Sequence, residues 1–419
     1  MERLTVKQIR SVAEQYGTPC FLAFPNRFRT NLTNFRNAFE KYYDRFVLSY
    51  SFKTNYTPFL LKTVKEMGGY AEVVSDMEYD LALQMGFSGE HIILNGPIKR
   101  PNLLRKAIIN KSIIQLDSEY EVDSVIRISK ELSDKVQVGL RVNMEINTDG
   151  SHSAIQAGLK ESRFGFPLSE LKAVVSRLKE HKIKIISLHG HTSTTNRVVE
   201  NYQIISQRLL EVCKQNSLDD ICYLDIGGGF FGAPPLELDV SGKPTYLDYA
   251  KGVCDIMLRD DWFVTHRPYI VIEPGTSVVA NVFELLTQIY QHKNIKGHHF
   301  VFVDATISQV RPARGVVNYP FEIVSNYVSQ PEITADIVGA TCMEVDIISN
   351  QVKLSHYHYG DLLVYKAVGA YRINMFPIFI LYKSPIVIYE DGDFSLYTRR
   401  QDIAHFMRSN MEYLESLVS

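Results

Sequence analysis

Lys53 is the first residue of this sequence whose position indicates chemistry. It lies in "YSFKTN", residues 50–55, at the end of the apolar run "FVLSYSF", which is typical of a buried strand in a parallel sheet. Taking a charged amine out of water is costly unless a partner or a reaction uses it. We therefore expect a buried Lys53 that either forms a structural ion pair or acts as a Schiff-base lysine with a lowered pKa.

A glycine triplet and a glutamate follow two later apolar runs. Gly227, Gly228 and Gly229 come after "CYLDI", and Glu273 comes directly after "YIVI". Three glycines leave backbone N–H groups open to a phosphate, although such a triplet is more often a tight turn. Glu273 could be solvated, pair with a helix end, or face the cationic nitrogen of a cofactor. A lysine, a phosphate loop and a carboxylate together indicate pyridoxal 5′-phosphate as the cofactor.

These residues need a scaffold that brings the ends of several strands together. Between about residues 27 and 280, short apolar runs alternate with amphipathic helical stretches; the runs are "FVLSYSF", "AEVVS", "HIILNG", "SIIQLD", "VQVGLRVN", "IKIISLHGH", "CYLDIGGG" and "YIVIEPG". Eight such units predict a (β/α)8 TIM-type barrel, whose active sites lie at the carboxyl ends of the strands. An open, doubly wound sheet is the alternative.

After residue 280 the pattern changes to strands joined by short turns, with few helices. Runs such as "HHFVFVDA", "GDLLVYKAVGAY" and "PIVIYED" predict an all-β module, a β-sandwich or β-barrel. The early segment "PCFLAF" is a further strand, which belongs either to the barrel edge or to this module. We predict a barrel domain over 27–280 and a β domain formed by 1–26 and 281–419.

The composition excludes several other classes of protein. The chain has 419 residues, of which 45% are hydrophobic and 22% charged, with a formal net charge of −2. No block of like charge predicts a nucleic-acid or membrane partner, and the longest apolar stretch is broken by Pro377, Lys383 and Pro385. The start of the sequence lacks the apolar segment of a secretory signal. Five scattered cysteines without metal-type spacing favour a reducing cytoplasm and no bound metal.

A series of short motifs runs through nearly the whole chain. In order they are "YSFKTN", "VVSDMEYDLAL", "ILNGPIK", "LRVN", "SRFGF", "LHGHTS", "LDIGGGF", "IEPGTSVVAN", "VDATISQVRPA", "VGATCMEVD", "GDLLVY" and "GAYRINM". With these motifs the chain resembles the fold-type III pyridoxal-phosphate-dependent decarboxylases, the group of diaminopimelate, ornithine and arginine decarboxylases. The resemblance implies an alanine-racemase-like barrel with a C-terminal β domain.

The resemblance also implies a role for each matching residue. Lys53 matches the Schiff-base lysine, His191 the histidine that stacks on the cofactor ring, and Glu273 the carboxylate on the ring nitrogen. In the β domain, Cys342 matches the cysteine that returns a proton after carbon dioxide leaves, and Tyr371 a tyrosine near the cofactor phosphate. The phosphate loop, a phosphate-binding hydroxyl, an arginine near the ring and a glutamate of the second barrel loop match Gly227–Gly229, Thr194, Arg141 and Glu78.

The reaction implied by the family is loss of carbon dioxide from an amino acid, protonation at Cα and release of the amine. Family members are homodimers, so Cys342 and Tyr371 would complete the site of the partner chain. An acid at Glu273 favours a decarboxylase over the related alanine racemases, which have an arginine against the ring nitrogen. A racemase, and a catalytically inactive homologue with a regulatory binding role, are the alternatives.

The sequence departs from the family pattern beside the expected catalytic cysteine. Met343 follows Cys342 where the family has an acid that reads a distal ammonium, and Glu344 comes one place later. A buried cationic group that loses its carboxylate loses about 3–5 kcal/mol. We therefore expect poor binding of lysine, ornithine and diaminopimelate, unless Glu344 turns inward and replaces the missing acid.

Two further departures affect the space for substrate. Thr276 replaces a family arginine that helps to bind phosphate or a distal carboxylate. In "RPARG", Arg311 is kept, whereas Arg314 and Gly315 replace a leucine and a tyrosine. Gly315 leaves room, and Arg314 adds an anion contact if it does not point into solvent. The expected substrate is a larger or acidic amino acid, bound by Arg311, Arg314, Met343, Glu344 and Tyr371.

Overall fold

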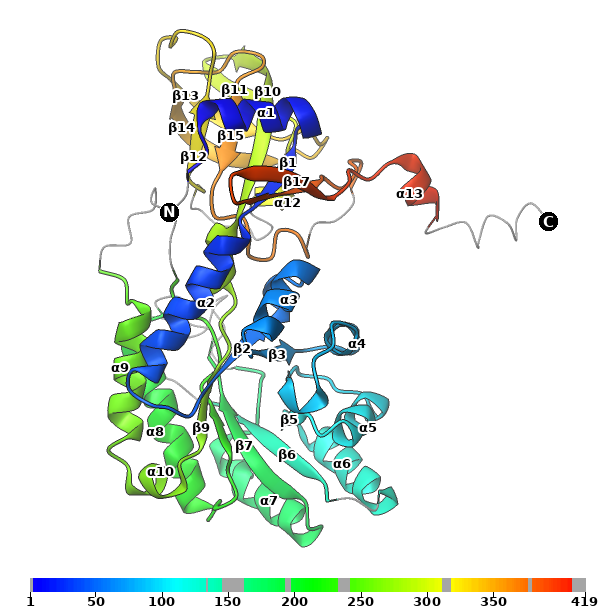
Figure 1. Cartoon of the computed structure of the whole chain (residues 1–419), viewed down its shortest axis with the longest axis vertical. Coiled ribbons are helices and arrows are strands. Elements are labelled where there is room, and N and C mark those ends of the chain that lie inside the picture. Colours follow the sequence, from blue (N-terminus) through cyan, green and yellow to red (C-terminus); the bar gives the residue numbers. More distant parts are fainter. Residues whose placement is uncertain are drawn as a thin grey trace, which may run out of the picture. The chain divides into compact units, whose positions relative to one another are not determined.

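The computed structural model of this protein divides into two compact units, which are described separately (Figure 1). One unit is formed by residues between Arg29 and Val278, and the other by residues up to Phe28 and from Val279 onward. The structure describes residues 3–132, 135–144, 162–192, 197–232, 242–310, 318–375 and 379–408. Within these ranges, no helix is both long enough and apolar enough to cross a membrane.

Eight parallel strands close the first unit into a barrel. Each strand pairs with the next along the chain, and the last pairs back with the first. The strands are β2 (Phe46–Ser51), β3 (Tyr70–Val73), β4 (Ile92–Leu94), β5 (Ile113–Leu116), β6 (Gln137–Val142), β7 (Lys184–Gly190), β8 (Tyr223–Asp225) and β9 (Tyr269–Ile272). The predicted (β/α)8 fold class is confirmed, and the open sheet is wrong.

Helices alternate with these strands along the chain. They are α2 (Pro25–Glu40), α3 (Pro58–Glu66), α4 (Asp76–Gln84), α5 (Pro101–Ile109), α6 (Glu119–Glu131), α7 (Leu168–Glu180), α8 (Val199–Gln215), α9 (Tyr246–Met257), α10 (Asp261–His266) and the single turn α11 (Thr276–Val279). Local sequence fixes several of their starts. Ser75 accepts the N–H of Glu78 at α4, and Thr245 and Asp248 form a capping box at α9. These contacts satisfy N–H groups that have no partner within the helix.

The barrel interior is apolar at the amino ends of the strands. A buried cluster there consists of Val47, Ile93, Ile113 and Val271, with Tyr70, Tyr223 and Tyr269 packed against it. Because this end is filled with apolar side chains, polar groups inside the barrel gather toward the carboxyl ends. Gln115 Nε2, for example, donates to Ser187 Oγ over 2.6 Å in the interior.

The second unit is built mainly from one sheet. Its strands are β1 (Cys20–Ala23), β10 (Phe283–Ile295), β11 (His298–Val303), β12 (Phe321–Val324), β13 (Ile333–Val338), β14 (Ile347–Leu354), β15 (Leu362–Tyr365), β16 (Ile386–Glu390) and β17 (Asp393–Thr398). The main order is β14-β13-β11-β10-β1-β16-β17, and β15 joins β10 to β12. Short helices α1 (Val6–Tyr16), α12 (Ile307–Val310) and α13 (Ile403–Arg408) accompany it.

The early strand β1 belongs to this sheet unit and not to the barrel edge. It pairs antiparallel with β10 and parallel with β16. Its residues Cys20 and Leu22 pack into a core with Ile9 and Val12 of α1. Apolar burial thus ties the N-terminal helix and strand to the later half of the chain.

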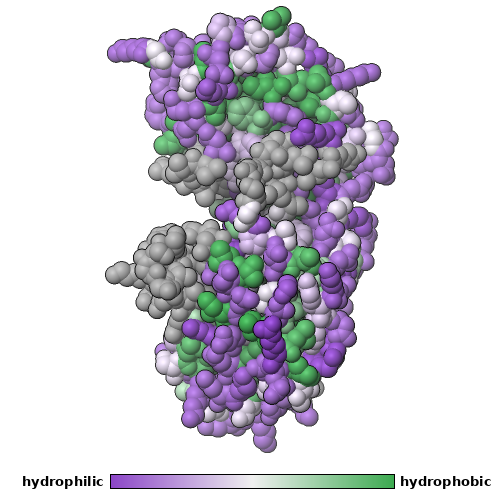
Figure 2. Space-filling model, turned by 90° about the vertical axis from the view of Figure 1, so that its left-hand side faces the viewer, coloured by the Kyte–Doolittle hydropathy of each residue, from purple (hydrophilic) through white to green (hydrophobic). Residues whose placement is uncertain are grey.

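One face of the sheet unit carries apolar side chains at its surface. Phe300, Phe302, Val338 and Ile347 line a cavity of about 590 Å³ on strands β11, β13 and β14. We call these strands' outward side the outer sheet face. On the side of the molecule drawn in Figure 2, apolar side chains gather on the sheet unit, in the upper part of the picture.

Candidate active site

Lys53 lies at the carboxyl end of β2, in a single 3-10 turn formed by Phe52–Thr54. Its Nζ is 2.5 Å from Glu72 Oε2. The Lys53 side chain is 42% exposed, whereas that of Glu72 is 1% exposed. The expectation of a buried lysine is therefore wrong for this chain, because the turn carries the amine out of the strand and toward the barrel mouth. The ion pair that the sequence left open is present.

Glu72 and Asn95 connect Lys53 to Glu273, which follows the neighbouring strand β9. Asn95 Nδ2 donates to Glu72 Oε1 over 3.1 Å and to Glu273 Oε1 over 2.5 Å. Ser51 Oγ also donates to Glu72. These residues come from β2, β3 and the segments after β4 and β9, so the closed barrel alone brings them together. Glu72 and Asn95 were not predicted from the sequence, although each stands at the end of an apolar strand, where a carboxylate or amide indicates a site residue.

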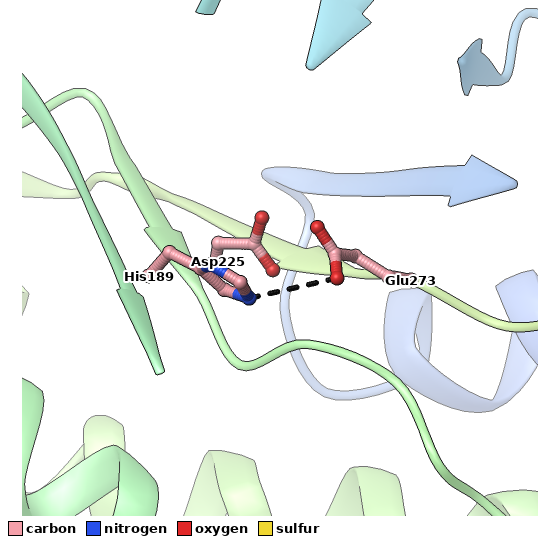
Figure 3. Close-up of side chains that lie close together, drawn as sticks. All are labelled: His189, Asp225 and Glu273. Atoms are coloured by element: carbon pink, nitrogen blue, oxygen red, sulfur yellow. Dashed lines mark ion pairs between the residues drawn. The ribbon is translucent and has the colours of Figure 1, made fainter. Parts of the chain in front are cut away.

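Three buried side chains from successive strands converge at the same barrel mouth (Figure 3). His189 comes from β7, Asp225 from the end of β8, and Glu273 follows β9. His189 Nε2 lies 3.5 Å from Glu273 Oε2, and one ligand atom from each of the three lies within 4.8 Å of the others. Asp225 was not predicted as a site residue, although it lies two residues before the first glycine of the loop.

The two carboxyl groups of this cluster differ in protonation. Burial raises the pKa of Asp225, and the charge of Glu273 raises it further. Burial also opposes ionisation of Glu273, but His189 and Lys53 outweigh it and hold its pKa below the ordinary value. The mouth therefore presents one neutral acid and one carboxylate, and the carboxylate is the residue that the sequence predicted to face a cationic nitrogen.

Arg141 brings a buried positive charge to the same end of the barrel. Its Nη1 lies 3.5 Å from Asp117 Oδ2, and its guanidinium carbon lies 4.6 Å from the centroid of the Phe164 ring. Burial lowers the pKa of Arg141, and Asp117 and Glu273 oppose this effect. An arginine starts from so high a value that the guanidinium stays charged.

His191 presents a neutral ring beside His189. The Gly228 N–H donates to His191 Nδ1 over 3.2 Å, which places the ring proton on Nε2. The His189 and His191 rings are nearly parallel, at 10°, with centroids 6.4 Å apart. Burial, with the charges of Arg141 and His189, lowers the pKa of His191 to about 3. The predicted phosphate ligand Thr194, three residues later, lies outside the described residues.

The glycine loop is needed for close packing. A Cβ on Gly228 would lie 2.3 Å from the carbonyl oxygen of Glu273, and one on Gly227 would lie 2.6 Å from His191 Cβ. The N–H groups of Gly227 and Gly228 donate to Asp225 Oδ1 and to His191. Gly229, at φ +91°, has no hydrogen-bond acceptor for its N–H among the described residues. One amide of the three is thus left for a phosphate.

Glu78 adds a titratable group near Lys53. It is buried at the start of α4, where its Oε2 accepts the Val74 N–H over 2.8 Å. Burial raises the pKa of Glu78 to about 7; Glu72 acts in the same direction, and Lys53 opposes it. A carboxyl group that titrates near neutral pH therefore lies at the second barrel loop.

The mouth contains buried polar atoms that lack partners. Among the described residues, no hydrogen-bond partner lies near Asn95 Oδ1, Arg141 Nε, His189 Nδ1 or Ser277 Oγ. Leaving such atoms unpaired is costly, so they fit a site that receives a polar group. A heterocyclic cation against Glu273 matches this donor set. The trio His189, Asp225 and Glu273 is also close enough to hold a metal ion, so geometry alone leaves both groups open.

The remaining predicted residues lie in the sheet unit. Cys342 is exposed, Met343 half-buried and Glu344 exposed on the connection between β13 and β14, which we call the Cys342 turn (residues 339–346). All three line the cavity of the outer sheet face. Tyr371, at φ +67°, is half-buried on another loop. Arg311 and Arg314 lie outside the described residues.

Comparison with known proteins distinguishes between a coenzyme and a metal ion at the barrel mouth. A model of the family "Pyridoxal-dependent decarboxylase, pyridoxal binding domain" matches residues 27–280. Diaminopimelate decarboxylase of Aquifex aeolicus is 26% identical over 416 residues, which cover 96% of this chain and 94% of that protein. A probable chloroplastic diaminopimelate decarboxylase of Oryza sativa subsp. japonica is also 26% identical, covering 97% and 82%.

Solved structures share the fold. Diaminopimelate decarboxylase of Helicobacter pylori complexed with L-lysine has a TM-score of 0.84 at 23% identity, covering 96% of this chain and 99% of that one. Arginine decarboxylase of Paramecium bursaria Chlorella virus has a TM-score of 0.71 at 21% identity, covering 88% and 95%. At these identities the likeness shows the fold alone. The matched family covers more than half of the sequence, so the chain belongs to the pyridoxal-phosphate-dependent decarboxylases of the diaminopimelate, ornithine and arginine group.

Proposed function

We propose that the residues at the barrel mouth hold the coenzyme in the roles that the sequence predicted. Lys53 is its covalent anchor, Glu273 faces the ring nitrogen, and His191 stacks on the ring. Arg141 lies near the ring, and Gly229 donates to the phosphate. The observation that carries this assignment is the buried Glu273, 3.5 Å from His189 and bound by Asn95, at the same barrel mouth as Lys53.

The chain's own groups prepare the reaction. When bound, pyridoxal phosphate supplies an electron-poor ring that accepts the electron pair of the Cα–carboxylate bond. Glu72, 2.5 Å from Lys53 Nζ, takes the proton that the amine must lose before it can attack a carbonyl carbon. Glu273, held ionised, stabilises positive charge opposite it. His191, held neutral, offers a flat face without adding charge.

Cys342 supplies the last proton in this proposal. After carbon dioxide has left, the substrate Cα needs one proton before the amine can be released. The thiol of Cys342 donates it and is reprotonated from solvent, to which Cys342 is exposed in the chain. Each turnover consumes one proton and releases one carbon dioxide and one amine.

We also propose a homodimer in which this thiol reaches the site of the partner chain. The support is the outer sheet face, where apolar side chains and the Cys342 turn share one open cavity. Mixing inactive Lys53→Ala and Cys342→Ala variants tests it, since random exchange gives mixed dimers with one intact site. Activity should return to about a quarter of the wild-type value. No recovery, despite subunit exchange, would contradict shared sites.

The proposed substrate is a larger or acidic amino acid, carboxylated, phosphorylated or conjugated, and not lysine, ornithine or diaminopimelate. Met343 carries this choice, because it is half-buried beside Cys342 where the family has an acid. Glu344, one residue on, is exposed. A distal ammonium placed against the Met343 thioether would lack a counter-charge.

A substrate panel tests this proposal. Carbon dioxide release is measured for L- and D-forms of lysine, ornithine, arginine, glutamate and phosphoserine and for meso-diaminopimelate. We expect an anionic or conjugated amino acid to have the highest kcat/KM. Met343→Glu should raise kcat/KM for diaminopimelate roughly 100-fold, whereas the control Met343→Leu should not. Clear preference of the wild type for a cationic amino acid would overturn the proposal.

Diaminopimelate is the second candidate. The named relatives that align over nearly the whole chain are diaminopimelate decarboxylases. In that case Glu344 would have to turn inward and replace the missing acid, so Glu344→Gln would lower kcat/KM for diaminopimelate. Under the first proposal that variant changes little. A racemase would release no carbon dioxide from any member of the panel.

A further inference from the structure

One buried carboxylate, Asp346, fixes the Cys342 turn. Its side chain is buried, and Oδ2 accepts the Thr341 N–H over 3.0 Å and the Thr341 hydroxyl over 2.6 Å. The other oxygen, Oδ1, accepts the Thr306 hydroxyl over 3.0 Å and the Ile307 N–H over 2.7 Å. Each oxygen therefore binds a different segment, and the side chain joins the turn to the start of α12.

The backbone of the turn is folded tightly around this carboxylate. Gly339 N–H donates to the Asp346 carbonyl over 2.8 Å, and Asp346 N–H donates to the Met343 carbonyl over 3.0 Å. A Cβ on Gly339 would lie 2.4 Å from Asp346 Oδ2. Only glycine therefore leaves room for the carboxylate at this point.

The helical turn α12 is also tied to the loop that carries Tyr371. The buried Arg372 donates from Nε to the Val310 carbonyl over 2.6 Å and from Nη1 to the Ala370 carbonyl over 2.6 Å. Asp346 holds the first residue of α12, and Arg372 holds the last. The segments bearing Cys342 and Tyr371 are thereby fixed to one common element.

The charge of Asp346 is balanced without a cation. Among the residues that the structure describes, no lysine, arginine or histidine forms an ion pair with it. Four neutral donors satisfy its two oxygens instead, which compensates for burial of the charge. An asparagine has a single acceptor oxygen, so it can accept from one segment but must present its NH₂ to the donors of the other.

We propose that Asp346 is a positioning residue, which clamps the Cys342 turn to α12 so that the thiol is held where it returns a proton to the substrate Cα. This inference rests on the proposed role of Cys342. Asp346 itself does not touch the reacting atoms. Its loss should therefore impair proton delivery more than substrate binding.

Asp346→Asn is the first test, with Asp361→Asn as the matched control. Asp361 is a buried carboxylate of the same unit that accepts the His358 N–H over 2.8 Å, away from the Cys342 turn. In Asp346→Asn, amide hydrogen exchange of residues 305–310 and 339–346 should quicken about tenfold or more. For the best amino acid of the panel, kcat should fall about 10- to 100-fold with KM changed less than about threefold.

The ratio of amine to carbon dioxide separates positioning from mere destabilisation. It should drop below one in Asp346→Asn and stay at one in Asp361→Asn. Protonation away from Cα would leave the amino group on the coenzyme and release the rest of the substrate as a carbonyl compound, whose oxygen comes from water, instead of the amine. Thr341→Val removes one donor and should show a weaker form of the same defect, even if Asp346→Asn fails to fold. Gly339→Ala should resemble Asp346→Asn.

Three outcomes decide between the hypotheses. The clamp is overturned if amide hydrogen exchange of the Cys342 turn is unchanged in Asp346→Asn. It is also overturned if exchange is faster but kcat and the ratio of amine to carbon dioxide are unchanged. If Cys342→Ala leaves the product ratio and kcat unchanged, the proposed role of Cys342 fails. If Cys342→Ala is impaired while Asp346→Asn and Thr341→Val are not, only the clamp fails.

Discussion

The barrel mouth and the Cys342 turn are held in place by different forces. At the mouth, ionised and neutral side chains are buried against one another, as in the cluster of His189, Asp225 and Glu273. In the turn, Asp346 accepts from neutral donors only, and Cys342 is exposed. The mouth is an electrostatic network, whereas the turn is a hydrogen-bonded scaffold.

This difference has consequences for substitutions. In the mouth, each charge sets the protonation of its neighbours, so that one change alters several groups at once. In the turn, a change acts through the position of the backbone. Substitutions in the mouth should therefore change coenzyme binding and pH dependence, and those in the turn should change proton delivery.

Lys53→Ala should have the largest effect. Loss of the covalent anchor should lower kcat/KM at least ~1,000-fold and abolish the visible absorption of the bound coenzyme. Stability should fall as well, because the variant leaves the carboxylate of Glu72, 1% exposed, without its cation. Absorption spectra and carbon dioxide release check this, with Lys62→Ala as the exposed control. Retained activity in Lys53→Ala would contradict the assignment.

Glu273→Gln should have the next largest effect. It keeps the volume and removes the charge opposite the proposed ring nitrogen, so kcat should fall roughly 100- to 1,000-fold. The coenzyme should remain covalently bound, since Lys53 is intact. Kinetics together with coenzyme content measured after denaturation test this. A variant with unchanged kcat would show that the carboxylate does not act on the ring.

Lys99→Met tests a buried ion pair of the barrel that lies outside the proposed site. Lys99 Nζ lies 2.9 Å from Glu121 Oε2, and both side chains are fully buried. The variant leaves a buried carboxylate unpaired and should lose about 3–5 kcal/mol of unfolding free energy. Lys106→Met breaks an exposed pair with Asp80 and should lose about 1 kcal/mol or less. Equal losses in denaturant unfolding would contradict the distinction.

Glu78→Gln should have the smallest effect, a change in how the free energy of unfolding depends on pH. Burial raises the pKa of Glu78 from 4.5 to about 7 in the folded protein, so its contribution to stability is present below pH 4.5 and lost as the pH rises through about 7. That loss amounts to at most about 3 kcal/mol. Glutamine keeps an acceptor for Val74 but does not titrate.

Unfolding of the coenzyme-free protein at pH 5 and pH 8 measures this effect. The wild type should lose more stability between the two values than Glu78→Gln, whereas the exposed control Glu66→Gln should follow the wild type. Identical losses in the wild type and Glu78→Gln would show that Glu78 does not titrate in this range.

The sequence was sufficient to predict the barrel because its signals are local. Eight apolar runs alternate with capped helices, and Lys53 and Glu273 both follow strands that the structure confirms. The site's charge network was not predictable in the same way. Asn95 joins Glu72 to Glu273 only because the sheet closes, and no spacing along the chain encodes that contact.

The exposure of Lys53 and the strand partners of β1 could not be predicted from the sequence either. Lys53 was expected to be buried, but one 3-10 turn after β2 carries it to partial exposure. The sheet pairing of β1 depends on residues more than 260 positions away; Cys20, for example, pairs with Leu286. Asp346 lies three residues beyond Met343 and contacts Thr306, so its role emerges only from the folded turn.

Reduction of the coenzyme-loaded protein with borohydride, followed by proteolysis and mass spectrometry, tests the central claim most directly. We predict a single pyridoxyl label, on the peptide that contains Lys53. A label on any other lysine, or no label in protein that releases carbon dioxide, would contradict the proposed site.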